Sequence, residues 1–340
     1  MSDQQLVLVT GVTGFIGAHV AVSLLKQGYR VRGTVRSMEK ANELVRLNPE
    51  LKGKIEFVIV KDVMEPNAFK DVVKDCDYIC HIASPFIVTN ITDNKAQLLD
   101  PAVQGTLSAL EAAVTEPKVK RVVITSSFAA VGDFTKDPYN GYTYTEKDWN
   151  PITYEEAVKT DNGIVAYCAS KVFAEKAAHN FVKEKQPHFD IAAVNPPYVF
   201  GPPIHPMNSM DSLNTSNQIL WNVINGSKLQ PSTQHLEVDV RDIADAHVVA
   251  LKRSELSNGR LLVSQGSFFT NTMSNVFLKQ FPEKKDLISE PSEVPFNSKH
   301  YTIDNSLSKS LGMKYYSEEQ TYIDTAAKLW ERAKEFSQAK

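Results

Sequence analysis

Two side chains that can work as a proton relay lie four residues apart. Tyr167 and Lys171 occur in Ile164–Lys185, whose apolar spacing predicts a helix, and residues four apart share one helix face. A phenol with an ordinary pKa of about 10 transfers protons poorly at neutral pH, and a nearby ammonium lowers that pKa. Ser127 follows an expected strand and offers a neutral hydroxyl. We therefore expect the three side chains to hold and protonate a substrate oxygen.

A glycine-rich stretch near the N-terminus supports this interpretation. Leu6–Val9 is an apolar run of strand length, and Ala18–Leu25 begins a helical pattern. Between them lie three glycines at three-residue spacing, Gly11, Gly14 and Gly17. A strand that leads through glycines into a helix N-terminus presents free N–H groups to an anion. We expect a dinucleotide pyrophosphate here, although an ordinary strand-to-helix turn is the alternative. The Tyr-x-x-x-Lys pair alone is a weak indication of a dinucleotide-dependent enzyme. It becomes a strong indication when it occurs together with the glycines and the serine.

The residues after the second expected strand, Tyr29–Val35, decide between the two nicotinamide cofactors. A site for NAD places an acidic residue about 20 residues past the glycines, where it binds the ribose hydroxyls. This sequence has Arg36 there, and Lys40 follows one turn into the next helix. Both cations can pair with a ribose 2′-phosphate, which an acid would repel. A solvated basic edge is the alternative, but the missing acid favours NADP(H).

Strands and helices alternate along the first part of the chain, which is typical of an α/β protein with a doubly wound parallel sheet. Ligands of such Rossmann sheets bind at the carboxyl ends of the strands. We expect residues 1–190 to form mainly the NADP-binding domain, with residues 191–195 returning to the sheet. Residues 196–340 should form mainly a smaller mixed α/β lobe for substrate, including a helix over Asp242–Leu251 and a strand over Gly259–Val263. The other expected elements are strands Ile55–Val60, Tyr78–Ala83, Val119–Thr125 and Ile191–Val194, and a helix over Ala96–Val114.

Composition argues against several other classes of protein. Of the 340 residues, 42% are hydrophobic and 23% are charged, as in an ordinary globular protein. A net charge of −3 offers no electrostatic basis for binding nucleic acid or an anionic membrane. No apolar run approaches the roughly 20 residues that cross a bilayer, and no leader-like segment precedes the first strand, so we expect a cytoplasmic protein. Three cysteines and eight histidines show no ligand spacing, so we expect no metal.

These motifs resemble those of extended short-chain dehydrogenases/reductases of the dihydroflavonol reductase-like branch, and most of all the fungal NADPH-dependent methylglyoxal (3-methylbutanal) reductases. The resemblance extends to about His247 and implies a carbonyl reductase with Ser127, Tyr167 and Lys171 as the catalytic residues. Pro197 departs from the usual pattern, which puts the shape of the pocket in doubt. The stretches that carry the resemblance are TGVTGFIG, TVRSMEK, HIASPF, VVITSSFAAV, AYCASKVFAEKAA, NPPYVFGP, LNTSNQ and DVRDIADAH.

The resemblance also implies which residues contact NADPH. Asp62 and Val63 would meet the adenine, although Asp62 could equally cap the following turn. Small residues around Ala83 would let backbone lie along the ribose, Val199 would lie near the nicotinamide amide, and Ser216 near the pyrophosphate. The remaining residues expected at the cofactor are Gly11, Thr13, Gly14, Phe15, Ile16, Gly17, Arg36, Lys40, Tyr167 and Lys171.

Three aromatic residues follow the carboxyl ends of expected strands and are candidates for a substrate pocket. They are Phe86, Phe134 and Tyr198. Each could equally be a core residue, because aromatic side chains are common in cores. Arginine and lysine are missing from the same segments, so we expect an apolar, uncharged carbonyl substrate such as 3-methylbutanal, methylglyoxal or an aliphatic or aryl ketone.

Three other functions share the fold. A sugar-nucleotide epimerase would have the same Ser-Tyr-Lys set, but would need an acid after the second strand. A hydroxysteroid or flavonoid dehydrogenase would differ only in its pocket. A redox-sensing dinucleotide-binding regulator would not need an intact Ser127, Tyr167 and Lys171. The sequence leaves open whether the protein is a monomer or a homodimer.

Overall fold

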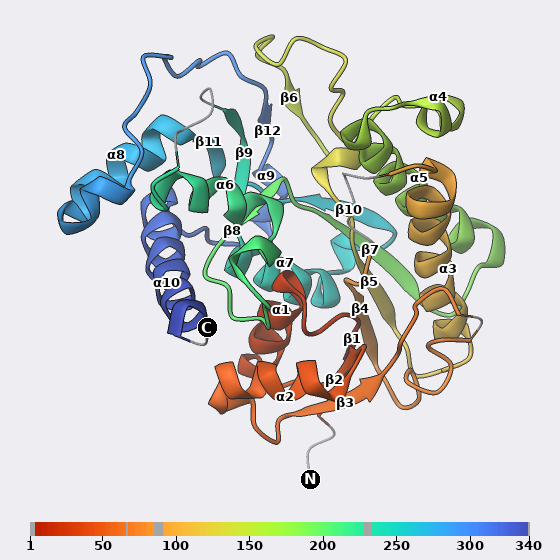
Figure 1. Cartoon of the computed structure of the whole chain (residues 1–340). Helices are drawn as coiled ribbons and strands as arrows, with labels where there is room; N and C mark the ends of the chain where they lie inside the picture. The colour runs from red at the N-terminus through yellow and green to blue at the C-terminus, as the bar shows by residue number, and fades with distance from the viewer. Residues whose placement is uncertain (1–3, 66, 85–90, 228–232, 339–340) are drawn as a thin grey trace.

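A seven-stranded sheet forms the centre of the protein (Figure 1). The computed structural model describes residues 4–65, 67–84, 91–227 and 233–338. All neighbouring strands of the sheet are parallel, in the order β10-β7-β5-β4-β1-β2-β3. The chain order reverses between β1 and β4, the place where such sheets bind ligands, so the doubly wound Rossmann fold is confirmed. The strands are β1 Leu6–Val9, β2 Arg30–Val35, β3 Ile55–Ile59, β4 Tyr78–His81, β5 Arg121–Thr125, β7 Asp190–Asn195 and β10 Gly259–Leu262.

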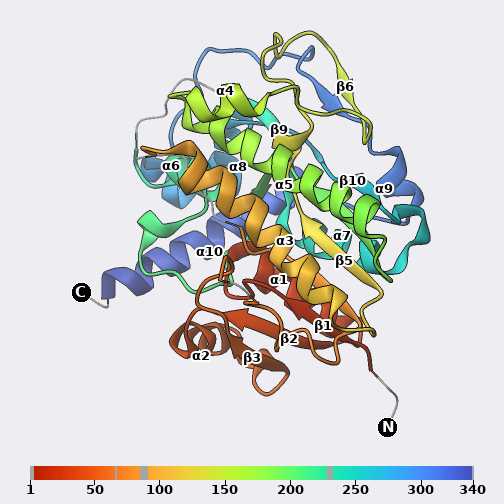
Figure 2. The same ribbon diagram turned by 90° about the vertical axis from the view of Figure 1, so that its right-hand side faces the viewer.

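Helices cover both faces of this sheet (Figure 2). In β1, Leu6 and Leu8 pack in the core under α3 and α5, whereas Val7 and Val9 pack in the core under α1 and α7. This alternation follows from the two-residue period of a strand, and a sheet buried on both faces needs apolar residues throughout. The expected helix over Ala96–Val114 begins as a π-helical turn, Lys95–Leu99, and continues as α3. The helices are α1 Phe15–Lys26, α2 Met38–Leu47, α3 Asp100–Val114, α5 Gly163–Lys185 and α7 Val240–Lys252.

Two elements that we expected in the second lobe belong to the central sheet instead. β10 pairs in parallel with β7 as its edge strand, and α7 packs against α1 on one face. Ile243 and Ala246 of α7 share a core with Val194 of β7. The sequence pattern identifies a buried strand and an amphipathic helix, but not which sheet edge they join. The chain therefore enters the second lobe, returns to the sheet and leaves it again.

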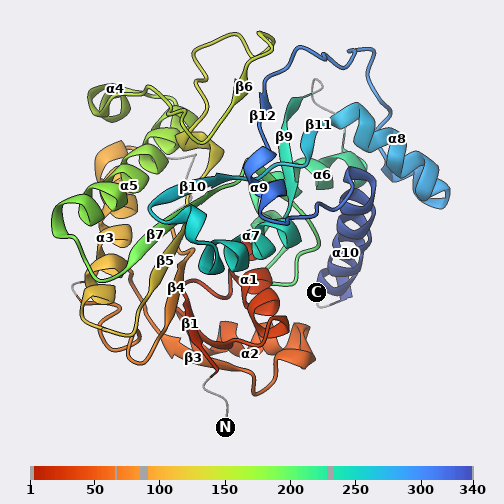
Figure 3. The same ribbon diagram turned by 180° about the vertical axis from the view of Figure 1, so that it is seen from behind.

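The second lobe is built on a three-stranded sheet with the order β11-β9-β8, and it lies beside the carboxyl edge of the main sheet (Figure 3). Its core contains Phe200, Phe268, Phe277, Tyr322 and Leu329, all fully buried. No helix in the described part of the chain is long and apolar enough to cross a membrane. The remaining elements are β6 Thr143–Tyr144, α4 Tyr154–Lys159, β8 Tyr198–Phe200, α6 Thr215–Ile224, β9 Gln234–Asp239, β11 Gly266–Phe269, α8 Thr270–Gln280, β12 Thr302–Ile303, α9 Ser306–Ser310 and α10 Glu318–Gln338.

Candidate active site

The glycine loop between β1 and α1 folds tightly back on itself. Gly11 has a φ of +68°, which favours glycine, and its carbonyl accepts a hydrogen bond of 2.9 Å from the Gly14 N–H. A Cβ on Gly17 would lie 2.3 Å from the same carbonyl oxygen, so no side chain fits there. No side chain caps the N-terminus of α1. The first turn of α1, with Phe15 and Ile16, therefore offers backbone N–H groups to an anion, and Thr13 precedes it.

The end of β2 presents two cations beside this loop. Arg36 is exposed directly after the strand, and Lys40 lies in the first turn of α2, whose N-cap is Ser37. Among the described residues, neither side chain forms an ion pair with a carboxylate. Thr34, inside β2, accepts a 3.0 Å hydrogen bond from the Gly11 N–H and so holds the glycine loop against this strand. Both cations are thus available to a phosphate beside the loop.

On the adenine side of the expected cofactor site, the structure supports the alternative role for Asp62. Its Oδ1 accepts a 2.9 Å hydrogen bond from the Met64 N–H, which closes a turn, and the side chain is exposed. Val63 is half-buried, and a Cβ on Gly105 of α3 would lie 3.4 Å from it. Ala83 lies against the glycine loop, with its Cα 3.3 Å from the position of a Cβ on Gly11. Contact of Asp62 and Val63 with an adenine stays a prediction.

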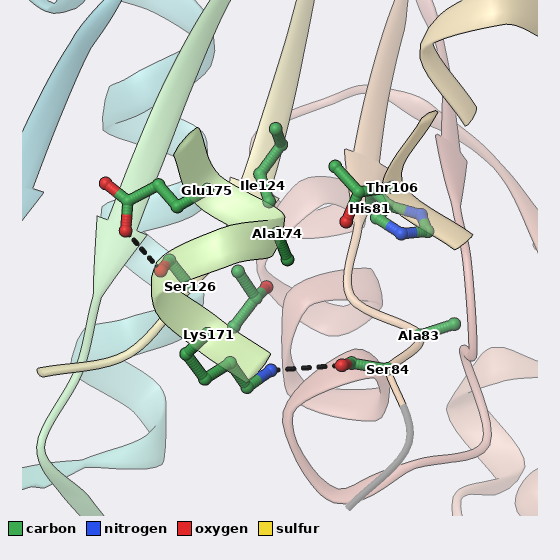
Figure 4. A pocket seen from close by; sticks show the side chains of 10 residues that line it. His81, Ala83, Ser84, Thr106, Ile124, Ser126, Lys171, Ala174 and Glu175 are labelled. Atoms are coloured by element: carbon green, nitrogen blue, oxygen red, sulfur yellow. Dashed lines mark hydrogen bonds between the residues drawn. The ribbon is translucent and has the colours of Figure 1, made fainter. Parts of the chain in front are cut away.

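The structure brings Ser127, Tyr167 and Lys171 together at the carboxyl edge of the sheet. Ser127 is the second residue after β5, and its Oγ accepts a 3.1 Å hydrogen bond from the Ala129 N–H. Tyr167 and Lys171 come from one face of α5, and the Lys171 Nζ lies 5.8 Å from the centre of the Tyr167 ring. The same Nζ donates a 3.1 Å hydrogen bond to the Ser84 Oγ (Figure 4). This spatial grouping is the one that their sequence order predicted.

Burial, rather than the neighbouring ammonium, dominates the protonation of the phenol. Burial raises the pKa of Tyr167, and its hydrogen bond with Ser127 works in the opposite direction. The net shift is therefore opposite to the lowering that we expected from Lys171, because burial removes the phenolate from water and so disfavours its charged form. Burial also lowers the pKa of Lys171 to about 8, while the charge of Glu175 works against this shift. At neutral pH the tyrosine is thus a phenol beside an ammonium.

A cavity of about 10 Å³ lies next to Lys171. Figure 4 shows its polar lining, which includes His81, Ser84, Ser126 and Glu175. Sequence reasoning missed Glu175. The signal that could have found it is its position four residues after Lys171 and eight after Tyr167, on the same buried face of α5. In the described part of the chain, no three His, Cys, Asp or Glu side chains form a group that could hold a metal ion.

The residues expected near the nicotinamide and pyrophosphate contact each other. Ser216, at the start of α6, accepts a 3.0 Å hydrogen bond from the Val199 N–H of β8, and both residues are buried. The Ser216 hydroxyl therefore holds the second lobe's strand and helix together in this structure. Its contact with a pyrophosphate, and that of Val199 with an amide, stay predictions.

Two of the three predicted pocket aromatics fall in the described part of the chain. Tyr198 is stacked on His235, with ring centres 5.1 Å apart, and is a partly buried residue that packs against the lobe's core. Phe134 is 49% exposed and meets Phe128, next to Ser127, edge to face at 6.0 Å. Phe86 lies outside the described residues. A pocket shared by the three aromatics therefore stays a prediction.

Comparison with known proteins places this geometry in a family. The model of the NAD dependent epimerase/dehydratase family matches residues 7–263. The chain belongs to this family. It is 66% identical over 98% of its length to C513.07 of Schizosaccharomyces pombe, a protein named as an oxidoreductase, of which it covers 99%.

Solved structures confirm the resemblance to fungal methylglyoxal reductases. The crystal structure of yeast methylglyoxal/isovaleraldehyde reductase Gre2 complexed with NADPH is 36% identical, with a TM-score of 0.87, and the match covers 96% of this chain and 98% of that one. The NADPH complex of Gre2 from Candida albicans is 35% identical, with a TM-score of 0.88, over 96% of this chain and 99% of that one. The likeness therefore extends over both the sheet and the second lobe.

Proposed function

We propose that this protein is an NADPH-dependent carbonyl reductase that converts aldehydes and ketones to alcohols. The observation that carries the proposal is the grouping of Ser127, Tyr167 and Lys171 at the carboxyl edge of the sheet, beside an uncapped helix N-terminus. The names of the Gre2 relatives, which include methylglyoxal, isovaleraldehyde and NADPH, support the same activity. The family description also covers epimerases, but Arg36 in place of an acid after β2 favours NADPH and a reductase.

The cofactor site of this chain fits NADPH. The glycine loop leaves no room for side chains near α1, so a pyrophosphate can approach the backbone closely. Arg36 and Lys40 would bind the 2′-phosphate through charge-assisted hydrogen bonds. Ala83 would lie along the ribose, where Lys171 can also donate. When bound, NADPH supplies a hydride to the carbonyl carbon.

The chain's own residues would manage the oxygen of the substrate. The raised pKa keeps Tyr167 protonated, so its hydroxyl can donate a proton to the oxygen as negative charge develops there. The Ser127 hydroxyl would donate a hydrogen bond to the same oxygen and so favour the transition state over the ground state. The Lys171 ammonium would then stabilise the phenolate that the proton leaves behind.

The substrate is proposed to be an apolar, uncharged aldehyde or ketone. Tyr198 and the exposed Phe134 offer aromatic surface near the expected site, and a carboxylate there would lose hydration without a cation to replace it. The test is NADPH oxidation with 3-methylbutanal, methylglyoxal and an aryl ketone, compared with pyruvate. We expect the uncharged carbonyls to have the higher kcat/KM. Faster turnover of pyruvate would contradict the proposed substrate class, and no NADPH oxidation with any carbonyl would contradict the proposed function.

Two further expectations remain proposals. A cytoplasmic location is supported by Cys76, Cys80 and Cys168, which are free and buried, because disulfides are rare in that compartment. Either a monomer or a homodimer is compatible with the site, since the triad and the glycine loop come from one chain.

A further inference from the structure

A buried carboxylate lies at the junction of three strands behind the catalytic residues. Glu175 of α5 is 1% exposed. Its Oε2 accepts hydrogen bonds from the hydroxyl of Ser126, which directly follows β5, and from the Asn195 Nδ2 of β7 at 2.8 Å. Its Oε1 accepts a 2.5 Å hydrogen bond from the Arg260 Nε of β10. One side chain therefore connects α5 to three neighbouring strands of the sheet.

This carboxylate is ionised, and its charge is balanced. Burial raises the pKa of Glu175, but His179, Arg260 and Ser126 outweigh that effect and hold the pKa below its usual value. The Arg260 guanidinium also donates to the carbonyl of Asp148 at 2.5 Å and lies 3.9 Å from the centre of the Trp149 ring. A buried charge is tolerated when it is paired and fully hydrogen-bonded, as this one is.

The contacts of Glu175 lead directly to Ser127. Ser126 precedes it in the chain, and the Asn195 Nδ2 that binds Glu175 also donates a 3.2 Å hydrogen bond to the Ser127 carbonyl. The backbone on both sides of the Ser127 side chain is thus attached to one carboxylate. A movement of that carboxylate would displace the hydroxyl that is expected to hold the substrate oxygen.

Glu175 also faces Lys171 from one helical turn away. The other titratable neighbours of Lys171 are Tyr167 on the same helix and His81 of β4, and burial lowers the pKa of His81 to about 4, so its ring is neutral. Ser84 adds an uncharged hydroxyl. The negative charge of Glu175 therefore favours the ammonium form of Lys171.

We propose that Glu175 is a positioning residue of this site: it fixes the backbone that carries Ser127 and supplies a negative charge one helical turn from Lys171. The inference rests on the proposed reductase activity, and it adds Glu175 as a supporting residue to the three proposed catalytic residues. A purely structural role is the alternative, because any buried ion pair that loses one partner destabilises a protein.

Three variants separate the two roles. Glu175→Gln removes the charge and keeps the shape, and Glu175→Asp keeps the charge and shortens the side chain. Asp190→Asn is the matched control, because Asp190 pairs with Arg121 at 2.5 Å and joins the same strands, β5 and β7, at their opposite ends. Each variant is compared with the parent protein by its Tm, by kcat with 3-methylbutanal and by the pH dependence of kcat/KM.

We expect Glu175→Gln to lower kcat by about tenfold or more, as misplacing a catalytic group does. It should also move the alkaline limb of the pH profile to lower pH, because Lys171 loses its stabilising anion. Glu175→Asp should lower kcat and leave the alkaline limb unchanged. Asp190→Asn should lower only the Tm. An equal fall in Tm for Glu175→Gln and Asp190→Asn, with kcat and the pH profile unchanged in both, would overturn the proposal.

A measurement without turnover keeps this inference separate from the proposed activity. The rate at which acetic anhydride acetylates Lys171, measured against pH by mass spectrometry, reports the pKa of that lysine. We expect a lower pKa in Glu175→Gln than in the parent and the parent pKa in Glu175→Asp. An unchanged pKa in Glu175→Gln would contradict the electrostatic role of Glu175 even if no carbonyl is reduced.

Discussion

The protonation states of Tyr167 and Lys171 set what the site can do. In the proposed reaction, Tyr167 holds its proton until the substrate oxygen takes it, and burial raises the pKa of this phenol. The same proposal needs Lys171 as an ammonium, although burial favours its neutral form. Burial favours the neutral form of both side chains, which suits Tyr167 but not Lys171. Ser84 and Glu175 compensate for this at Lys171: Ser84 accepts a hydrogen bond from its ammonium, and the negative charge of Glu175 raises its pKa.

Replacing Tyr167 by phenylalanine should abolish most turnover. Tyr167→Phe removes only the hydroxyl, so kcat should fall by about 10²–10⁴-fold, the usual contribution of a general acid. The Tm and the NADPH dissociation constant, measured by fluorescence, should stay close to those of the parent. Near-parent turnover with any carbonyl substrate would show that another group donates the proton.

Activity should also fall as the pH rises through about 8, the pKa of Lys171 in the folded protein. Below that pH the lysine carries its proton and can stabilise the phenolate, and above it the ammonium is lost. The measurement is kcat/KM for 3-methylbutanal against pH. A profile that stays flat to about pH 10, where an ordinary lysine titrates, would contradict this role of Lys171.

Arg36 should determine the choice of cofactor. A hydrogen bond between charged groups contributes about 1.5–3 kcal/mol, so Arg36→Ala should lower the preference for NADPH over NADH by roughly tenfold or more. The loss should appear in the KM for NADPH. Arg30→Ala is the control, because Arg30 is exposed at the opposite end of β2 and should leave the preference unchanged. Equal use of both cofactors by the parent would contradict the assignment.

Among the elements, the first strand–turn–helix unit and α5 are those that sequence reasoning predicted best. In both, the candidate site residues are close in the sequence, so a fixed spacing is enough to place them on one loop or one helix face. The strands of the sheet agree with their expected ranges to within about two residues. β10 and α7 were expected in the second lobe but belong to the central sheet, because apolar periodicity indicates that an element is buried but not what it packs against.

The glycine loop packs too closely against α1 to accept a side chain on Gly17. A Cβ on Gly17 would lie 2.3 Å from the Gly11 carbonyl, so Gly17→Ala should push α1 away from the loop. We expect an unfolding free energy lower by about 1–3 kcal/mol, the usual cost of overpacking, and weaker NADPH binding. Both are measurable by denaturant titration and fluorescence.

Gly105→Ala is the matched control. Gly105 lies inside α3, its Cβ would lie 3.4 Å from the Val63 side chain, and alanine favours a helix over glycine by about 0.5–1 kcal/mol. That variant should keep or raise stability and bind NADPH normally. Equal behaviour of the two alanine variants would contradict the close packing of α1 on the loop.

In the whole molecule, the site depends on contacts between segments that are distant in the sequence. The Glu175 network joins positions 85 residues apart, from Glu175 to Arg260, and no spacing pattern connects them. Such partners become visible only once the sheet order brings β5, β7 and β10 together. The sequence could therefore predict that Ser127, Tyr167 and Lys171 lie together and that a glycine loop joins β1 to α1, but not the groups that support them.

The pairing of β6 with β12 affects how this protein could be recombined with its relatives. β6 lies in the loop after Ser127, β12 lies near the C-terminal end, and the Thr302 and Asp304 N–H groups donate to the Tyr142 and Tyr144 carbonyls at 2.9 and 2.8 Å. In a chimera that takes only this loop from another reductase, the transplanted loop would have to pair with the β12 of this protein, which lies more than 150 residues away and did not come from the same parent. Residues 138–144 and 299–304 should therefore be exchanged together, as one inherited unit.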